Sequence, residues 1–314
     1  MMQCNRHRTI RKHPWSIAVL LVALAGATAC GGGETRLDAS AEGSDPLPSR
    51  VISLVPSATD LVIALGASDR LVGRTDYDKD PSIAHLSSVG GTTDPSLERI
   101  LRLRPDLVLV WQDSGRPKVG TTLRHLGART EAISASSLAD LRRTVVRLGQ
   151  ILQVPRRADS LLRAINDSLT AVREWAAARP TVRVFYLVWS NPLITSGGGT
   201  FVDSLIRAAG GVNVFGDQRA PWPAVTFEAL AARDPDVVVC PTESGRDTGI
   251  AALRSDARWR TLRAVRLGHL VAVDRDLFSR PGPRVAEAAR GLAVALHAET
   301  VVRHLPTANG AYQR

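Results

Sequence analysis

Two carboxylates occupy the same position in two copies of one sequence pattern. In the first copy, Ser96-Leu97-Glu98 is followed after six residues by Pro105-Asp106-Leu107-Val108. In the second copy, Thr226-Phe227-Glu228 is followed after six residues by Pro235-Asp236-Val237-Val238. Matched carboxylates on two similar lobes are more typical of a molecule that a partner grasps than of an ordinary enzyme. The pattern leaves open a simpler explanation, two ordinary helix starts with an acid in the first turn, where the helix dipole favours one.

Aromatic side chains are scarce, at 4% of the chain, and most lie at predicted strand ends or in the loops that follow. In sheets of parallel strands that edge is where ligands bind, and an aromatic there offers a flat apolar surface to a large ring system. The candidate ligand-binding residues are Tyr77, Trp111, Trp189, Trp222, Phe278 and Arg280. The alternative is that Trp111 and Trp189 simply close the ends of their sheets.

Catalytic and metal-binding patterns are absent from the sequence. It contains no Gly-x-Ser-x-Gly elbow and no His-Glu-x-x-His pair. The histidines beyond the first 29 residues lack metal-ligand spacing; they are His85, His125, His269, His297 and His304. The glycine-rich stretch 195–200 lacks the lysine of a phosphate-binding loop and is expected to be a tight strand-to-helix turn. We therefore expect no enzyme activity, no catalytic residue, no metal site and no resident cofactor.

The elements that must position these residues alternate between short strands and helices, which indicates parallel sheets with helices on their faces. The first lobe is expected over residues 50–153, with strands at 51–54, 107–111 and 130–134. Ser57 and Asp60 match a capping box at the start of its first helix. The second lobe is expected over 180–305, with strands at 182–189, 237–240 and 270–273. Residues 306–314 are expected to form a tail.

Between the two lobes, apolar residues recur at intervals of three and four from Ala158 to Trp175. This pattern predicts one continuous helix over residues 154–179. Its place between two similar halves favours a rigid connector over an ordinary covering helix. The expected fold class is α/β, with two Rossmann-like lobes joined by a single long helix.

Residues 1–29 have the basic start, short apolar core and small-residue end of a targeting segment. Cys30 follows directly, as the lipidated cysteine does in a bacterial lipobox, although Ala27 stands where leucine is usual. A lipidated Cys30 would tether the chain to a membrane surface, with residues 30–49 as a flexible tether. The remaining residues carry a net charge of about +6, since the targeting segment holds four bases and no acid. The basic residues are scattered, which gives no support to nucleic-acid binding, and Cys240 stands alone in an apolar strand.

Over residues 50–300 the chain resembles the periplasmic substrate-binding proteins of ABC importers for cobalamin and ferric siderophores. The resemblance rests on an ordered series of motifs: Arg50-Val51-Ile52-Ser53-Leu54, Pro56-Ser57-Ala58-Thr59, Leu97-Glu98-Arg99-Ile100, Arg104-Pro105-Asp106-Leu107-Val108, Thr195-Ser196-Gly197, Ala209-Gly210-Gly211-Val212-Asn213-Val214-Phe215, Pro221-Trp222-Pro223 and Arg280-Pro281-Gly282-Pro283-Arg284. It implies the class III periplasmic binding protein fold and a ligand held between the lobes. It also implies that Glu98 and Glu228 dock onto arginines of the permease.

Within the family the cobalamin-binding branch is most similar, on the positions of Tyr77, Trp111, Trp222 and the segment 276–280. One departure is the segment 90–93, Gly-Gly-Thr-Thr, where a well-known member has a further tryptophan. The resemblance implies a monomeric, lipid-anchored periplasmic protein that delivers a cobalt corrinoid to an ABC permease and its ATPase subunits. A ferric siderophore or haem is the alternative ligand, with Arg74, Arg280 and Arg284 holding an anionic chelate. A structural surface lipoprotein is the third reading.

Overall fold

The computed structural model describes residues 46–112, 118–243 and 248–298. The predicted targeting segment, Cys30 and the predicted tail lie outside these residues. The described residues form one compact unit.

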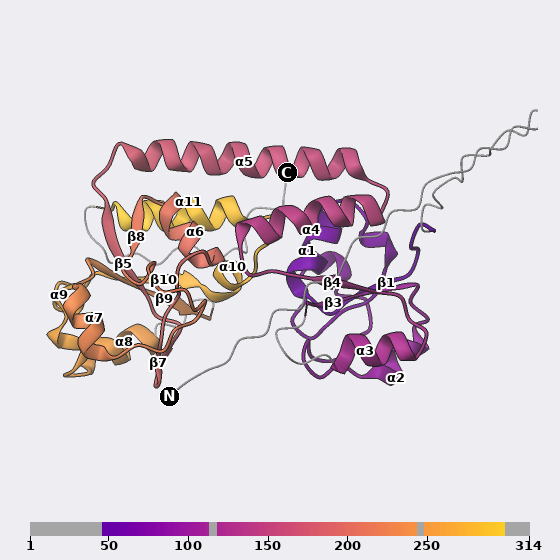
Figure 1. Ribbon diagram of the computed structural model, residues 1–314, viewed down its shortest axis with the longest axis horizontal. Coiled ribbons are helices and arrows are strands. Elements are labelled where there is room, and N and C mark those ends of the chain that lie inside the picture. Colours follow the sequence, from indigo (N-terminus) through magenta and orange to yellow (C-terminus); the bar gives the residue numbers. More distant parts are fainter. Residues whose placement is uncertain (1–45, 113–117, 244–247, 299–314) are drawn as a thin grey trace, which may run out of the picture. The chain divides into compact units, whose positions relative to one another are not determined.

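Four parallel strands form the sheet of the first lobe, in the order β2-β1-β3-β4 (Figure 1). The strands are β1 (Val51–Ser53), β2 (Leu71–Gly73), β3 (Leu107–Trp111) and β4 (Thr130–Ile133). The helices are α1 (Pro56–Ala64), α2 (Leu97–Arg102), α3 (Lys118–His125) and α4 (Leu138–Ile151). The central strands β1 and β3 are almost wholly apolar, as expected of strands whose sheet has helices on both faces, whereas the edge strand β4 is only partly buried.

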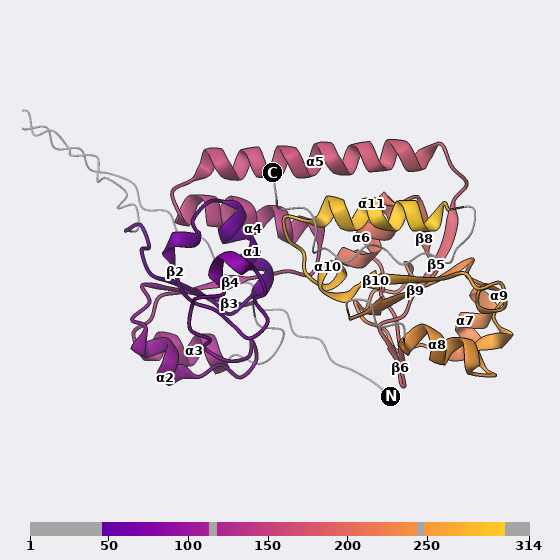
Figure 2. The ribbon, with the colours of Figure 1, turned by 180° about the vertical axis from the view of Figure 1, so that it is seen from behind.

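The second lobe repeats this arrangement with parallel strands in the order β10-β9-β5-β8 (Figure 2). These strands are β5 (Val182–Tyr186), β8 (Gly211–Asn213), β9 (Val237–Thr242) and β10 (Leu270–Asp274). A separate antiparallel hairpin joins β6 (Trp189–Ser190) to β7 (Leu193–Ile194). The helices are α6 (Phe201–Ala208), α7 (Phe227–Arg233), α8 (Thr248–Ser255), α9 (Arg263–Arg266), α10 (Arg275–Ser279) and α11 (Val285–Leu296).

The two faces of each sheet contribute to different hydrophobic clusters, because side chains alternate along a strand. In the first lobe, Val51 and Leu107 belong to one cluster, while Ile52 and Val108 belong to another that includes residues of α2 and α3. The sheet of the second lobe divides in the same way, with α7 and α8 on the second face. The first cluster contains residues of both lobes, so the two sheets share one core.

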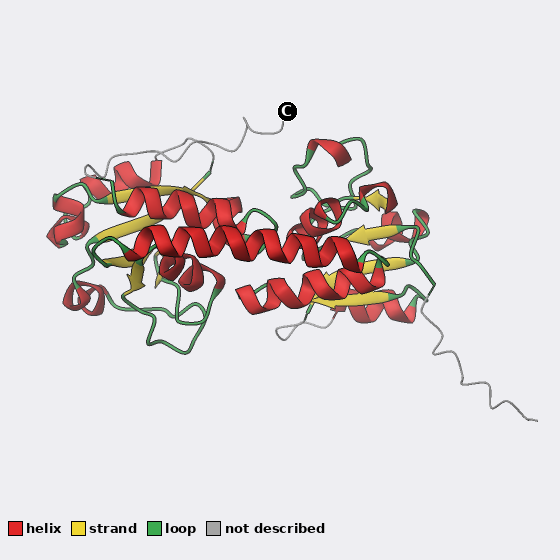
Figure 3. Cartoon of the chain, turned by 90° about the horizontal axis from the view of Figure 1, so that it is seen from above, coloured by secondary structure: helices red, strands yellow, loops and turns green. Residues whose placement is uncertain are grey.

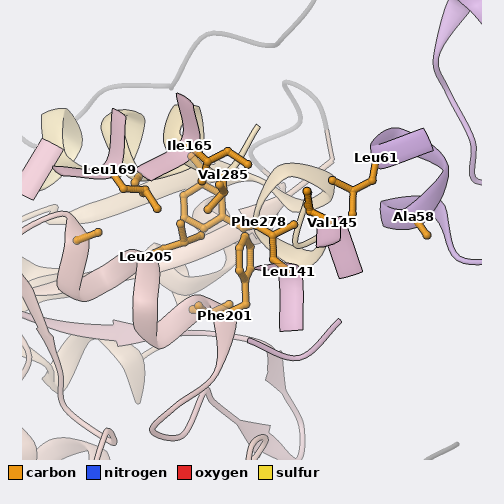
Figure 4. Packing of buried hydrophobic residues seen from close by; sticks show 14 of the residues in the cluster. Ala58, Leu61, Leu141, Val145, Ile165, Leu169, Phe201, Leu205, Phe278 and Val285 are labelled. Atoms are coloured by element: carbon orange, nitrogen blue, oxygen red, sulfur yellow. The ribbon is translucent and has the colours of Figure 1, made fainter. Parts of the chain in front are cut away.

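The long helix α5 (Pro155–Ala177) connects the lobes and lies over this shared core. It packs on α4 of the first lobe and on α6 and α11 of the second (Figure 3). Its buried face includes Ile165, Leu169 and Val172, at the spacing that a helix needs to present one apolar stripe. Figure 4 shows Ile165 and Leu169 among buried side chains from α1, α4, α6 and α11. The expected α/β fold class, two lobes joined by one long helix, is confirmed.

Two local expectations differ from the structure. Helix α1 begins at Pro56 and has Val55 as its N-cap, without a side-chain cap. Proline at the first helical position has a suitable fixed φ and no N–H to satisfy, so the capping box at Ser57 does not form. The strand expected over 182–189 ends at Tyr186, and Trp189 instead belongs to the β6–β7 hairpin. Among the described residues, no helix is both long and apolar enough to cross a membrane.

Candidate functional site

Tyr77 lies in the loop that follows β2, and its side chain is exposed. A buried carboxylate holds this loop: Asp78 Oδ2 accepts hydrogen bonds from the Thr75 backbone N–H at 2.6 Å and from the Thr75 hydroxyl at 2.8 Å. The Thr75 hydroxyl oxygen in turn accepts from the Tyr77 N–H at 3.2 Å. A Cβ atom added at Gly91 would lie 3.9 Å from Tyr77 Cε2. The segment 90–93 therefore lies beside the tyrosine ring.

Trp189 and Trp222 are brought together by the strand β7. Trp189 pairs with Ile194 in the hairpin, and Ile194 also bridges to Ala224, two residues after Trp222. The Trp189 indole N–H donates to the Asn191 carbonyl at 2.7 Å, which fixes one edge of the ring. The exposed fractions of Trp189 and Trp222 are 58% and 51%. Two large apolar rings thus stand in solvent on neighbouring segments.

The glycine-rich stretch forms the expected tight turn and supports the Trp222 loop. A Cβ at Gly197 would lie 2.0 Å from the Ala220 carbonyl oxygen, and one at Gly198 would lie 2.2 Å from that of Gly216. Only glycine permits this close backbone approach. Gly197 N–H donates to the Pro221 carbonyl at 2.9 Å, directly before Trp222. The turn therefore fixes the loop that carries Trp222.

Trp111 is the last residue of β3, and 42% of its surface is exposed. It lies at the carboxyl end of the first sheet, as Tyr77 does through β2. Both residues stand at the edge where parallel α/β sheets bind ligands.

An ionic contact joins the Tyr77 loop to α10 of the second lobe. Lys79 Nζ lies 2.5 Å from Asp276 Oδ2, and Arg280 Nη2 lies 3.1 Å from the other oxygen of the same carboxylate. The Asp276 carboxylate is thus shared by two cations. This contact brings Arg280, expected as a binding residue, close to the loop that carries Tyr77.

Phe278 differs from the expectation that it contacts a ligand. Its side chain is 1% exposed and stacks on Tyr186, with ring centroids 6.5 Å apart. In Figure 4 it lies among the labelled side chains of the shared core. The short helix α10 turns this residue inward while Asp276 remains at the surface. We therefore assign Phe278 to the core and leave it out of the proposed site.

Asp60 is a further charged residue in this region, and sequence reasoning did not select it as a site residue. Burial raises the pKa of Asp60 to about 6, and the nearby carboxylates Asp78 and Asp80 add to the increase. Arg280 and Arg284 of the second lobe oppose it. A Cβ at Gly282 would lie 3.9 Å from Asp60 Oδ2. The first turns of α1 therefore face the loop after α10.

Substituting Asp60→Asn should stabilise the protein at neutral pH. The folded carboxyl holds its proton up to about pH 6, whereas the unfolded one releases it near pH 4. Stability of the wild-type protein therefore falls as pH rises between about 4 and 6, and the cost at neutral pH is at most about 3 kcal/mol. Urea unfolding at about pH 7.5 should show this gain, and at about pH 4 it should vanish. The exposed Asp159→Asn is the control, and equal effects of both substitutions at each pH would contradict the assignment.

Glu98 and Glu228 lie in the first turns of α2 and α7, on exposed positions. Their side chains are 79% and 81% exposed. Glu98 pairs with Arg102 one turn along the helix, and Glu228 Oε1 lies 3.8 Å from Arg258 Nη2. The pKa of Glu228 lies below its usual value, because the carboxylate is stabilised by the Glu228 backbone N–H, the Thr226 hydroxyl and Arg258. Both lobes thus present an acidic side chain at the start of a short helix.

Cys240 and His297 make contacts that give them structural roles rather than roles in a site. Burial raises the pKa of the Cys240 thiol to about 12, so it stays protonated. His297 contacts the Ala209 carbonyl oxygen at 3.1 Å and packs against Trp175. Within the described part of the chain, no three histidine, cysteine or acidic residues are grouped as metal ligands. His304 lies outside that part.

Two similar lobes of parallel α/β structure, joined by one long helix, define a class III periplasmic binding protein. The family model described as "Periplasmic binding protein" matches residues 51–277, and the chain belongs to this family. A vitamin B12-binding protein of Vibrio parahaemolyticus is 31% identical over 258 residues, covering 81% of this chain and 90% of the relative. A vitamin B12-binding protein of Salmonella typhimurium is 30% identical over 248 residues, covering 79% and 90%.

Solved structures of binding proteins for two classes of ligand are similar to this chain. The periplasmic vitamin B12-binding protein of Vibrio cholerae has a TM-score of 0.66 at 27% identity, covering 79% of this chain and 96% of that one. A periplasmic haem-binding protein of Pseudomonas aeruginosa has a TM-score of 0.72 at 29% identity, covering 81% and 94%. The chain is thus a periplasmic substrate-binding protein that serves an ABC importer, and its relatives are binding proteins rather than enzymes.

Proposed function

We propose that this protein captures cobalamin or a related corrinoid and delivers it to the permease and ATPase subunits of an ABC importer. The observation that carries the proposal is the set of exposed aromatics at or near the carboxyl edges of the sheets. Tyr77, Trp111, Trp189 and Trp222 are each between 42% and 58% exposed. Covering a large exposed ring with a ligand removes apolar surface from water, which favours binding. The names of the relatives at about 30% identity support a corrinoid as that ligand.

A ferric siderophore or haem is the second candidate, favoured by the haem-binding structural relatives. Such a ligand is anionic and would use Arg74, Arg280 and Arg284. Arg280 is already paired with Asp276, and Arg284 makes a two-point contact with Glu287 at 2.7 Å for each bond. Asp60, Asp78 and Asp80 lie in the same region and would repel an anion. These charges favour a ligand held by aromatic contact and neutral polar groups.

The anchoring and docking parts of the proposal involve other residues. We propose that Cys30 carries lipid, which keeps the protein at the periplasmic membrane surface. We also propose that the protein is a monomer and has no resident cofactor. Glu98 and Glu228 bind arginines of the permease. Their exposure and their matched places in the two lobes support this role.

Titration calorimetry of residues 45–314 with cyanocobalamin tests the ligand assignment. One-to-one binding is expected. Tyr77→Ala and Trp222→Ala should each weaken it about 10-fold or more, as loss of a buried aromatic anchor does. Trp175→Ala is the matched control, because Trp175 is also exposed, at 40%, but lies near the C-terminal end of α5.

Binding of haemin instead of cyanocobalamin would move the assignment to the second candidate. Unchanged cyanocobalamin affinity in both the Tyr77 and Trp222 variants would contradict the site. Failure to bind either ligand would favour a structural surface role.

A further inference from the structure

The same arginine contact closes the end of the Glu-bearing helix in each lobe. In the first lobe, Arg50 directly precedes β1; its Nη2 donates to the Leu103 carbonyl at 2.6 Å and its Nε to the Arg104 carbonyl at 3.0 Å. In the second lobe, Arg183 of β5 donates from Nη2 to the Arg233 carbonyl at 2.5 Å. Its Nε donates to the Asp234 carbonyl at 3.4 Å. One guanidinium thus spans two consecutive carbonyls at the C-terminal end of α2 and of α7.

These carbonyls need a partner because the last carbonyls of a helix have none within it. The chain also leaves each helix through a residue with left-handed backbone: φ is 45° at Arg104 and 33° at Asp234. This conformation is unfavourable for a residue such as Arg104, while aspartate, the residue at position 234, tolerates it better. A cation at this end also interacts favourably with the helix dipole. Arg50 and Arg183 therefore give a partner to the carbonyls of a helix end that has none within the helix.

A carboxylate ties each turn to the strand from the other side. Asp106 Oδ1 accepts from the Arg50 backbone N–H at 3.0 Å, and Asp236 Oδ2 accepts from that of Arg183 at 2.9 Å. Burial acts to raise the pKa of Asp236, but the Arg183 N–H and Arg263 outweigh it and lower that pKa. The arginine and aspartate together connect the helix end, the turn and the first strand of each sheet.

The N-terminal ends of the same helices are fixed by hydroxyls. Ser96 accepts from the Arg99 N–H at 3.3 Å, and Thr226 accepts from the Ala229 N–H at 3.1 Å. The helices have six and seven residues, too short to be stable in isolation. The positions of Glu98 and Glu228 therefore depend on how both helix ends are held.

We propose that Arg50 and Arg183 are positioning residues for permease docking. Each holds a short helix so that its glutamate meets the permease in a fixed place, and the two together set the spacing and direction of the two carboxylates. This inference rests on the proposed docking role of Glu98 and Glu228. Neither arginine needs to contact the permease or the ligand.

The test uses the full-length protein and the permease–ATPase complex of the host's own importer, purified in lipid nanodiscs. Arg50→Met with Arg183→Met keeps the apolar stems and removes the donors. Docking should weaken about 10-fold, while cyanocobalamin affinity stays within about twofold. Arg50→Lys with Arg183→Lys should recover part of the docking, because lysine provides a cation without the two-point fork.

Arg157→Met is the matched control. Arg157 makes the same kind of contact at the end of α1, from Nη1 to the Leu65 carbonyl at 3.2 Å and the Gly66 carbonyl at 2.9 Å. No docking glutamate lies on that helix, so docking should be unchanged even where stability falls equally. Equal weakening by Arg157→Met would overturn the proposal in favour of a general loss of rigidity.

The variant Glu98→Ala with Glu228→Ala separates this proposal from the one on which it rests. If that variant loses docking and the arginine-to-methionine variant retains it, the positioning role is wrong and the docking role stands. If the glutamate variant retains docking, both are wrong. If the double arginine-to-methionine variant fails to fold, the two single variants, Arg50→Met and Arg183→Met, replace it, because each leaves the contact in the other lobe intact. Full docking by both single variants would overturn the proposal.

Discussion

Removing both docking carboxylates, Glu98→Ala with Glu228→Ala, is expected to abolish transport while leaving ligand capture intact. Each charge-assisted pair contributes about 1.5–3 kcal/mol. Loss of two such pairs should therefore weaken docking about 100-fold or more. Both carboxylates are largely exposed and lie on helices that cover the sheet faces away from α5, so their removal leaves no buried group without a partner. Uptake of cyanocobalamin into proteoliposomes, together with calorimetry, measures the two properties separately.

Glu174→Ala is the control for this prediction, because Glu174 is an exposed acid on α5. It should change neither transport nor binding. Normal uptake by the double variant would show that the carboxylates do not dock. A loss of cyanocobalamin affinity in the double variant would instead place them in ligand binding.

Phe278→Ala should cost about 3–5 kcal/mol of unfolding free energy, the usual range for deleting a fully buried aromatic. The ring is 1% exposed, stacks on Tyr186 and belongs to the core that both lobes share. Urea unfolding of the Phe278→Ala variant measures the cost. Trp222→Ala provides the opposite case: with 51% of its surface exposed, it should change stability by about 0.5 kcal/mol or less.

Phe278→Leu tests the alternative that this ring contacts the ligand. It retains an apolar side chain, so the protein should fold and bind cyanocobalamin normally with a moderate loss of stability. A stable Phe278→Leu protein that no longer bound cyanocobalamin would return Phe278 to the binding site.

The fold could be predicted because its signals are local and repeated. Alternation of short apolar strands with helices indicates parallel sheets, and the spacing of Leu161, Ile165 and Leu169 indicates a long helix wherever it packs. The end of β5 at Tyr186 was missed because an apolar run does not record where a backbone leaves the sheet. The beginning of α1 was missed because a polar pair suggested a cap that Pro56 makes unnecessary.

The residues of the site were harder to predict than the fold. Tyr77, Trp111, Trp189 and Trp222 are exposed at the expected places, and their roles remain predictions. Phe278, like most aromatics of the chain, lies at or just after the end of a predicted strand in the sequence. Whether Leu277 or Phe278 is buried depends on the orientation of the five-residue helix α10, which the sequence does not indicate. The contact of Lys79 with Asp276 joins residues 197 positions apart, and no local pattern indicates it. The contacts of Arg50 and Arg183 had a partial signal, the aspartate directly before each apolar strand segment of the repeat.

The shared core beneath α5 has a consequence for how the molecule responds as a whole. Side chains of α1 and α4 from one half, and of α6 and α11 from the other, belong to one continuous apolar cluster. Each half has a cluster of its own on the far face of its sheet, but the face toward α5 is buried only in the shared cluster, so we infer that the two melt together as one cooperative unit. A ligand that contacts either half would then protect both from unfolding, and from the proteases that attack unfolded chains.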